Sequence, residues 1–489
     1  MKVSFNPYYI LKPDNGRALL MDKEIYRDIP EGMDKGFEAL IHPVHAMILS
    51  FFHHTDVEKG IDNAANSLGI SCEAVASFVN KLIENDHAFE INVLGYTCVF
   101  PRRTLIESSK PPSARYNPQD FVYDKLDMRL KRHSSPTDIT LMINTRCATD
   151  CIYCYADRRK LMDCRIPLAR LEELIEEAGK FKARSFEIIG GEFFVYKHWK
   201  KVLTMLVKNG FDPYISTKIP LSENSVQFLA DIGVYDIQIS LDTLINKNLQ
   251  KILQVNNNYS KRMMDTLDLL EMYNVPVSIH TILNKENETA EDMRSVYEFI
   301  DGKKNINSWR VELAGPTMYL GCNAFDRYRN TKTSVEEVYQ FFDSIKEKDL
   351  GYKLSFGGTH PDNVNTNAVP QQKKGERPAC TANYSKIFIL PDGKVTICEE
   401  LYWHPTFIIG DVLQNTIQEI WNSDFAAYLY KIPQAHIPGD SPCSGCSYYS
   451  SCRDQSQSCW RDIIKGYGDD KWHYPDVNCE FAPQIINHV

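Results

Sequence analysis

Three cysteines, Cys147, Cys151 and Cys154, fall within the eight residues CATDCIYC. A structural zinc ion takes four protein ligands, and this short stretch offers no fourth Cys or His. A four-iron cubane takes one thiolate per iron, so three thiols would leave one iron open to another molecule. The spacing therefore predicts a [4Fe-4S] cluster with an open iron.

A second group of cysteines gathers in the C-terminal part of the chain. Residues 376–489 contain seven of them, at Cys380, Cys398, Cys443, Cys446, Cys452, Cys459 and Cys479. Seven thiols fit one cluster with four ligands and another with three better than they fit zinc sites of four with a remainder. The pattern favours two further iron–sulfur clusters, and zinc-ribbon spacing stays the alternative.

The remaining cysteines are isolated in the sequence. Cys72, Cys98 and Cys164 are scattered, and lone cysteines are usually small buried hydrophobic residues. Cys322 follows the last predicted strand of the central region, so it stays a candidate ligand. The chain begins without an apolar signal segment, and no apolar run approaches the roughly 18 residues of a membrane span. We therefore expect a cytoplasmic protein whose fourteen cysteines serve metal binding rather than disulfides.

The elements that must position the first three cysteines follow an α/β pattern. Six strand-like segments alternate with helical patterns and lie at 137–144, 185–192, 212–217, 235–242, 275–282 and 307–315. Regular alternation predicts a parallel sheet, and six units can curve into a partial (βα)6 TIM-like barrel with its active site at the carboxyl ends of the strands. Four motifs share that position: the cysteine loop, the Gly-Gly-Glu at 190–192, Ser240 and Asp242.

Residues 1–108 predict a separate unit. A hairpin around KPDNG, three short helices and a strand pair at 89–100 suggest a winged-helix-like domain, with Ser71 capping the third helix. Residues 1–100 carry 8 Lys and Arg against 14 Asp and Glu, which disfavours DNA binding. A polar, Pro-containing stretch at 109–118 then predicts a linker to a barrel region at 119–375.

The assembled motifs resemble the radical S-adenosylmethionine (SAM) superfamily, and within it the peptide maturases that carry a SPASM domain. CATDCIYC matches the motif Cys-x3-Cys-x2-Cys, with Tyr153 as the aromatic residue before the last cysteine. The resemblance implies that the open iron is chelated by SAM. Reductive cleavage of SAM would then give a 5′-deoxyadenosyl radical that abstracts hydrogen from a substrate, and the protein would position the reaction and exclude water.

The same resemblance assigns the SAM contacts. It implies that Gly190, Gly191 and Glu192 hold the methionyl amino group, and that the strand ending in Ser240 and Asp242 contacts the ribose and carboxylate side. In the third strand, ISTK stands where Thr-Asn-Gly is more usual. Ser216 and Thr217 are therefore the corresponding candidates.

The C-terminal region, 376–489, resembles a SPASM domain with two auxiliary [4Fe-4S] clusters, which makes three clusters in the chain. By position, Cys443, Cys446, Cys452 and Cys479 would hold the distal cluster, and Cys380, Cys398 and Cys459 the nearer one. Six residues separate Cys452 from Cys459 where the pattern has three. The nearer cluster then lacks a fourth thiol, so Cys322 or another side chain completes it, or its iron stays open to a substrate thiolate.

The N-terminal unit resembles the leader-peptide recognition domain of ribosomal-peptide maturases. The resemblance implies a precursor peptide that adds to a hairpin edge as a strand, and a flavodoxin- or ferredoxin-type electron donor. The expected activity is an oxidoreductase that installs an intramolecular cross-link, first of all a thioether from a Cys, with C–C or C–O links as other forms. Glu399, directly after Cys398, is the candidate substrate base. A formylglycine-forming sulfatase-type maturase and a zinc-binding regulator without catalysis are the alternatives.

Overall fold

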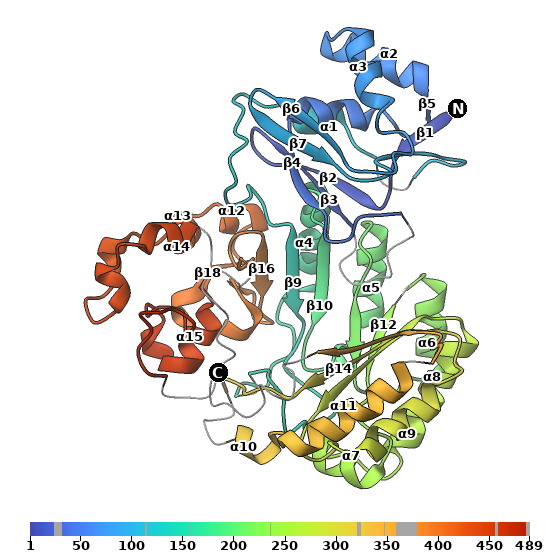
Figure 1. The fold of residues 1–489 in the computed structure, drawn as a ribbon, viewed down its shortest axis with the longest axis vertical. Coiled ribbons are helices and arrows are strands. Elements are labelled where there is room, and N and C mark those ends of the chain that lie inside the picture. Colours follow the sequence, from blue (N-terminus) through green and yellow to red (C-terminus); the bar gives the residue numbers. More distant parts are fainter. Residues whose placement is uncertain are drawn as a thin grey trace.

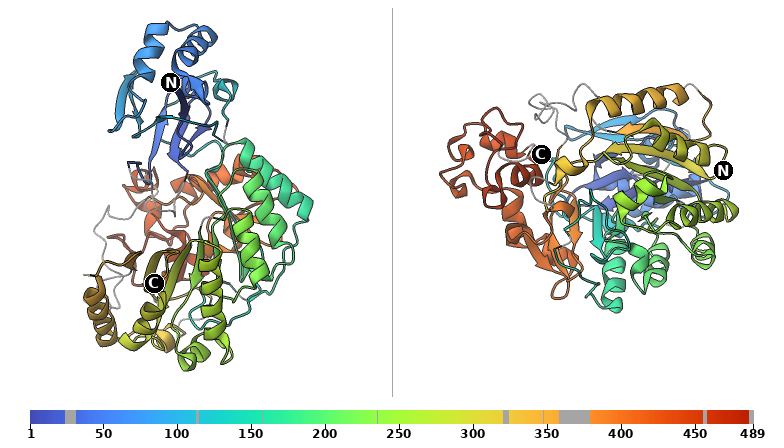
Figure 2. Two further views of the ribbon diagram at one scale, coloured as in Figure 1. Left: turned by 90° about the vertical axis from the view of Figure 1, so that its right-hand side faces the viewer. Right: turned by 90° about the horizontal axis from the view of Figure 1, so that it is seen from below.

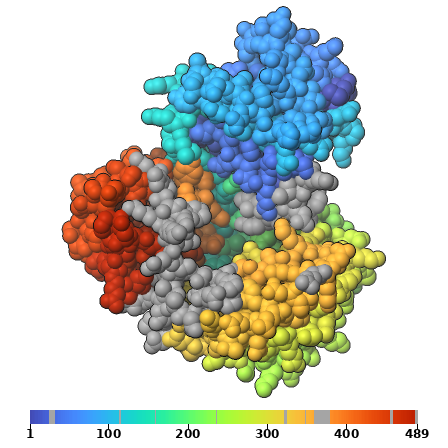
Figure 3. All heavy atoms as spheres, in the orientation of Figure 1, coloured from blue at the N-terminus to red at the C-terminus, as the bar shows by residue number. Residues whose placement is uncertain are grey.

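The computed structural model describes residues 1–23, 32–112, 115–157, 159–234, 236–319, 324–346, 348–357, 379–454 and 458–485. The chain forms three parts, an N-terminal unit, a central α/β unit and a C-terminal unit (Figures 1 and 2). The N-terminal unit stands apart as a lobe, while the other two share a sheet (Figure 3). Within the described ranges, no helix has the length and apolar character needed to cross a membrane.

In its described residues, the N-terminal unit contains three small sheets and three α-helices. Its strands are Lys2–Phe5 (β1), Tyr9–Pro13 (β2), Ala18–Asp22 (β3), Glu38–Ile41 (β4), Thr55–Asp56 (β5), Phe89–Val93 (β6), Tyr96–Phe100 (β7) and Leu105–Glu107 (β8). Its helices are Pro43–Ser50 (α1), Val57–Leu68 (α2) and Cys72–Val79 (α3). The predicted β2–β3 hairpin, three helices and β6–β7 pair are therefore all present. The Ser71 hydroxyl caps α3 by accepting from the Ala74 N–H.

The six predicted central strands all form, and the partial barrel is confirmed. They are Asp138–Met142 (β9), Ser185–Ile189 (β10), Ile215–Thr217 (β11), Ile237–Ser240 (β12), Val277–Leu283 (β13) and Ile306–Leu313 (β14), followed by Lys353–Gly357 (β15). All neighbouring pairs among them are parallel. Strands β10 and β11 are not hydrogen-bonded neighbours, so the wall consists of two sheets, one from β9 and β10 and one running from β11 to β15.

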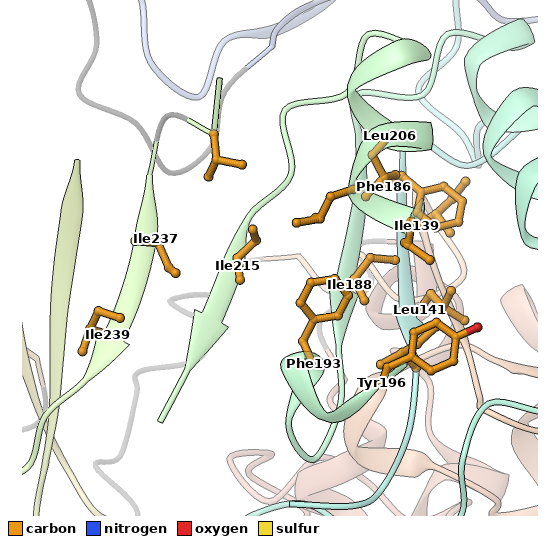
Figure 4. Packing of buried hydrophobic residues seen from close by; sticks show 14 of the residues in the cluster. Ile139, Leu141, Phe186, Ile188, Phe193, Tyr196, Leu206, Ile215, Ile237 and Ile239 are labelled. Atoms are coloured by element: carbon orange, nitrogen blue, oxygen red, sulfur yellow. The ribbon is translucent and has the colours of Figure 1, made fainter. Parts of the chain in front are cut away.

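Helices cover the outer face of this wall. They are Leu168–Lys180 (α4), Trp199–Lys208 (α5), Glu223–Asp231 (α6), Asn246–Leu253 (α7), Tyr259–Met272 (α8), Ala290–Ile300 (α9), Phe325–Tyr328 (α10) and Lys332–Lys346 (α11). Alternate strand residues such as Ile139 and Ile188 are buried with helix residues such as Leu206 in one continuous core (Figure 4). The period of two along each strand sends the intervening residues to the inner face.

The C-terminal unit extends the first sheet. Its strands are Lys386–Ile389 (β16), Lys394–Thr396 (β17) and Ile408–Asp411 (β18), and its helices are Ile417–Trp421 (α12), Asp424–Tyr430 (α13), Tyr449–Asp454 (α14) and Trp460–Tyr467 (α15). The predicted hairpin around Asp392-Gly393 forms, with Gly393 at φ +90°. Strand β16 then pairs parallel with β9, which gives the order β10-β9-β16-β17-β18. The Cys147–Cys154 loop follows β9 and Cys398 follows β17, so both are carried by strands of one sheet.

Candidate active site

The loop with Cys147, Cys151 and Cys154 follows the carboxyl end of β9. The Thr149 Oγ1 lies 3.3 Å from the Cys147 Sγ and 3.4 Å from the Cys151 Sγ. Two backbone N–H groups of the loop, at Asp150 and Ile152, donate to carbonyls at the end of α7. The three thiols are thus carried by a loop that is fixed to the barrel at both its strand and its helix side.

These thiols suit a metal cluster. Burial raises the pKa of Cys151 to about 11, and the nearby Lys218 ammonium opposes the shift. A desolvated thiol of this kind ionises when a metal cation binds it. Within the described residues, no three His, Cys, Asp or Glu side chains converge closely enough to enclose one metal ion. In a cubane each thiolate binds a different iron. The three sulfur atoms therefore lie farther apart than the ligands of a single metal ion.

The Gly190-Gly191-Glu192 turn lies directly against this loop. A Cβ on Gly191 would lie 2.1 Å from the Arg146 carbonyl oxygen, and one on Gly190 would lie 3.0 Å from that of Asn144. The Gly191 N–H donates to the Asn144 carbonyl at 2.9 Å, and the Glu192 N–H to the Arg146 carbonyl at 2.7 Å. Glycine is required here because the two backbones touch.

Glu192 is held in a defined orientation at the end of β10. Its carboxylate accepts from the Thr217 hydroxyl at 3.0 Å, from the Lys218 N–H at 3.2 Å and from the Phe194 N–H at 3.1 Å. Burial raises its pKa, and these hydrogen bonds oppose the shift. A buried carboxylate that is fixed in this way suits the amino group that the resemblance assigns to it.

Tyr153 and Asp242 meet around a residue that the sequence reasoning missed. The Lys218 Nζ lies 3.1 Å from the Asp242 Oδ2, and it donates to the Tyr153 hydroxyl, which also donates to Asp242. The second Asp242 oxygen accepts from the Ile282 N–H at 3.0 Å. The sequence signal for Lys218 is the departure of ISTK from Thr-Asn-Gly, in which Lys218 takes the last place.

Of the serine candidates, Ser216 lies on the face of β11 opposite Thr217. Ser216 is exposed and accepts from the Gln238 amide at 2.8 Å, whereas its neighbour Thr217 is buried against Glu192. Ser240 ends β12 in register with His280, which is in turn in register with Arg310. The structure therefore unites Thr217 with Glu192 but leaves Ser216 on the other face of β11.

A charged group lies on the inner face beside Ser240. The His280 Nε2 is 3.1 Å from the Glu312 Oε2, and the Arg310 Nε is 3.4 Å from the Glu312 Oε1. Hydrogen bonding to His280 lowers the pKa of Glu312, with Arg310 adding to the effect. Sequence reasoning missed this group because each residue alone resembles an ordinary strand residue.

The C-terminal cysteines are partly buried, and several of them influence one another electrostatically. Burial raises the pKa of Cys398 to about 12 and that of Cys459 to about 11, and a charge on Cys380 raises both further. Burial also raises the pKa values of Cys443 and Cys479. Charges on Cys452 and Cys479 add to the shift of Cys443, and charges on Cys452 and Cys446 add to that of Cys479. The division into a set of three and a set of four stays a prediction. Cys322 lies outside the described residues.

Glu399 and Glu400 differ sharply although they are adjacent. Glu400 pairs with Arg461 at 2.6 Å and with Lys465 at 2.9 Å, both on α15. Within the described part of the chain, the Glu399 carboxylate has no side-chain hydrogen bond or ion pair of its own. Burial raises its pKa, and the Lys386 ammonium on β16 opposes the shift. Glu399 is thus the one of the two that is available to take a proton.

Two family models match the chain. The radical SAM superfamily model matches residues 141–300, and the iron–sulfur cluster-binding SPASM domain matches residues 380–447. The chain therefore contains a region that matches the radical SAM superfamily and a region that matches the SPASM domain. This implies SAM and iron–sulfur clusters as cofactors, and the cysteines, the glycine cradle and Glu192 present suitable groups for both.

Among the proteins that are similar to this chain in sequence, two illustrate the range. One is the sporulation killing factor maturation protein SkfB of Bacillus subtilis, 22% identical over 287 residues. That match covers 58% of this chain and 64% of SkfB, so the chain spans less than two thirds of that relative. The other is a "Probable GTP 3′,8-cyclase" of Methanothermobacter thermautotrophicus, 22% identical over 55% of this chain and 86% of that protein.

Solved structures of SuiB from Streptococcus suis share the fold. SuiB bound to SAM gives a TM-score of 0.63 at 15% identity, over 98% of this chain and 100% of SuiB. SuiB bound to its precursor peptide SuiA gives 0.63 at 14% identity over the same shares of the two chains. The likeness therefore extends over the N-terminal unit, the barrel and the C-terminal unit together.

Proposed function

We propose that this protein is a radical SAM maturase of a ribosomally synthesised precursor peptide. The observation that carries the proposal is the match to SuiB over 98% of the chain, because it includes the N-terminal unit as well as the catalytic domains. SuiB has been solved with a precursor peptide, and SkfB is a maturation protein. The radical SAM domain alone also resembles a nucleotide cyclase, so the substrate class rests on the added units.

The proposed cluster ligands lie in two regions of the chain, the loop after β9 and the C-terminal unit. Cys147, Cys151 and Cys154 would hold the first cluster, and the two C-terminal sets would hold two auxiliary clusters, three [4Fe-4S] clusters in all. Bound SAM and the clusters supply hydrogen abstraction and one-electron transfer, for which a small flavodoxin- or ferredoxin-type donor is required. Glu192 and Asp242 orient SAM.

The product that we propose is an intramolecular cross-link, with a thioether from a Cys as the first candidate. Forming the C–S bond removes a hydrogen atom from carbon, a proton from the thiol and one electron. Glu399 is placed to take the thiol proton, since its carboxylate is free of the ion pairs that hold Glu400. If the nearer cluster instead binds the substrate thiolate, that base is dispensable.

N-terminal leader binding completes the proposal. Within the described residues, β6 pairs only with β7, and alternate β6 side chains are exposed. An extended leader can add to such an edge as a further strand, which raises the effective concentration of the core peptide at the barrel.

The test is mass spectrometry of the short peptide encoded beside this gene after co-production with the enzyme. A cross-link would remove hydrogen and retain the cysteine sulfur, whereas formylglycine formation would remove that sulfur. Anaerobically purified enzyme should contain about twelve irons and as many sulfides per chain. Stoichiometric zinc without iron, or an unmodified peptide with a fully loaded enzyme, would refute the proposal.

A further inference from the structure

Lys218 carries a buried charge whose donors are only partly used. Its side chain is 14% exposed, and its Nζ contacts Asp242 Oδ2 at 3.1 Å and the Tyr153 hydroxyl. An ammonium has three N–H donors, and these two acceptors leave one. Among the described residues, no third acceptor contacts the Lys218 Nζ. Burying a charge costs free energy unless its hydrogen bonds are complete. A further acceptor at the Lys218 Nζ would therefore stabilise the buried charge.

The position of this ammonium defines the missing acceptor. The Lys218 backbone N–H donates to Glu192 at 3.2 Å, and the Tyr259 hydroxyl donates to the Lys218 carbonyl at 2.5 Å, which fixes the residue. The Lys218 Nζ donates to the hydroxyl of Tyr153, which stands between Cys151 and Cys154 in the cysteine loop. The ends of β10 and β11 therefore present a carboxylate and an ammonium beside the three-cysteine loop. That pair is complementary to an α-amino acid group, with the amine toward Glu192 and the carboxylate toward Lys218.

We propose that Lys218 binds the methionyl carboxylate of SAM and is a further positioning residue of the SAM site. It would bind the carboxylate while keeping Tyr153 and Asp242 in place. The inference depends on the radical SAM domain and not on the identity of the peptide substrate, so it can fail while the proposed function stands. Its rival is a purely structural role, in which Lys218 only neutralises Asp242.

The two roles are separated by SAM and decarboxylated SAM, which differ only in the carboxylate. The dissociation constants of both ligands are measured by equilibrium dialysis with the cluster-loaded enzyme, for wild type and Lys218→Met. Loss of a charge-assisted hydrogen bond should weaken SAM about ten- to a hundredfold. Binding of decarboxylated SAM should change less than about threefold. The result is the ratio of the two dissociation constants for one variant. A partly misfolded fraction affects both measurements equally and leaves this ratio unchanged.

Controls make the outcome decisive. Lys251→Met removes a lysine that is 52% exposed and paired with Glu286, and it should leave both constants unchanged. Lys218→Arg keeps the charge and should restore much of the preference for SAM. Equal weakening of the two ligands by Lys218→Met would assign Lys218 a structural role through Asp242. No change in either ligand would remove it from the site. Both results would overturn the inference.

Discussion

Single residues of the same type have different roles in this protein because their neighbours differ. The Glu399 and Glu400 pair is the clearest case, since position after Cys398 favours Glu399 in the sequence and only the structure shows that Glu400 is held by ion pairs. Glu399→Gln should stop peptide modification and leave formation of 5′-deoxyadenosine, because the amide cannot accept the thiol proton. Both products are measured by mass spectrometry in one assay. Full modification by the Glu399 variant would instead favour direct binding of the substrate thiolate by the nearer auxiliary cluster.

Glu400→Gln is the matched variant. It leaves Lys465 without this partner and Arg461 with Asp462 alone, so it should cost about 1–3 kcal/mol of stability. A lower midpoint of thermal unfolding with retained chemistry is expected. Loss of modification without loss of stability would instead identify Glu400 as the base.

The three cysteines of the first loop provide another prediction at this scale. Replacing Cys147, Cys151 and Cys154 with Ala should abolish SAM cleavage and leave the auxiliary clusters, since those ligands lie on other strands and helices. Iron content should fall by about a third. Continued formation of 5′-deoxyadenosine would reject the assignment of this loop.

At the scale of elements, the site depends on close contact between the end of β10 and the cysteine loop. Gly191→Ala would place a methyl group 2.1 Å from the Arg146 carbonyl, where backbone must move. We expect a cost of about 1–3 kcal/mol and weakened SAM binding, because Glu192 shifts with the turn. Gly190→Ala, with a nearest approach of 3.0 Å, should be milder. Equal SAM affinity in the two variants would show that the contact does not position Glu192.

The elements themselves could largely be predicted from sequence, but their partners could not. Alternating apolar residues predict β9, β10 and β12 because one face of each packs on helices, and the Asp-Gly turn predicts the β16–β17 hairpin. Nothing local to β16 specifies its pairing with β9, which depends on contacts across more than two hundred residues of chain. The role of Lys218 could not be predicted for the same reason, since its partners Tyr153 and Asp242 lie on other strand–loop units.

At the scale of the whole molecule, the N-terminal unit is joined to the barrel by buried polar contacts. Lys12 on β2 is fully buried and donates to the Ser135 hydroxyl and to the Phe181 carbonyl. Arg17 donates to the Lys131 carbonyl and pairs with Asp14. Removing the unit therefore leaves these acceptors outside the unit without their hydrogen-bond donors. Activity could then be lost for structural reasons alone, so a loss of activity would not show what the unit binds.

The decisive measurement after deletion of residues 1–108 is consequently a comparison of two peptides. Intact enzyme should bind the full precursor at least about tenfold more tightly than the leaderless core, because the tethered core gains effective concentration. The truncated enzyme should bind both equally weakly and still cleave SAM without peptide, since the barrel carries its own site. Lys12→Met is the control, because it perturbs the docking and keeps the unit; it should retain the preference for the full precursor. A truncated enzyme that still prefers the full precursor would place leader recognition on the barrel or the C-terminal unit.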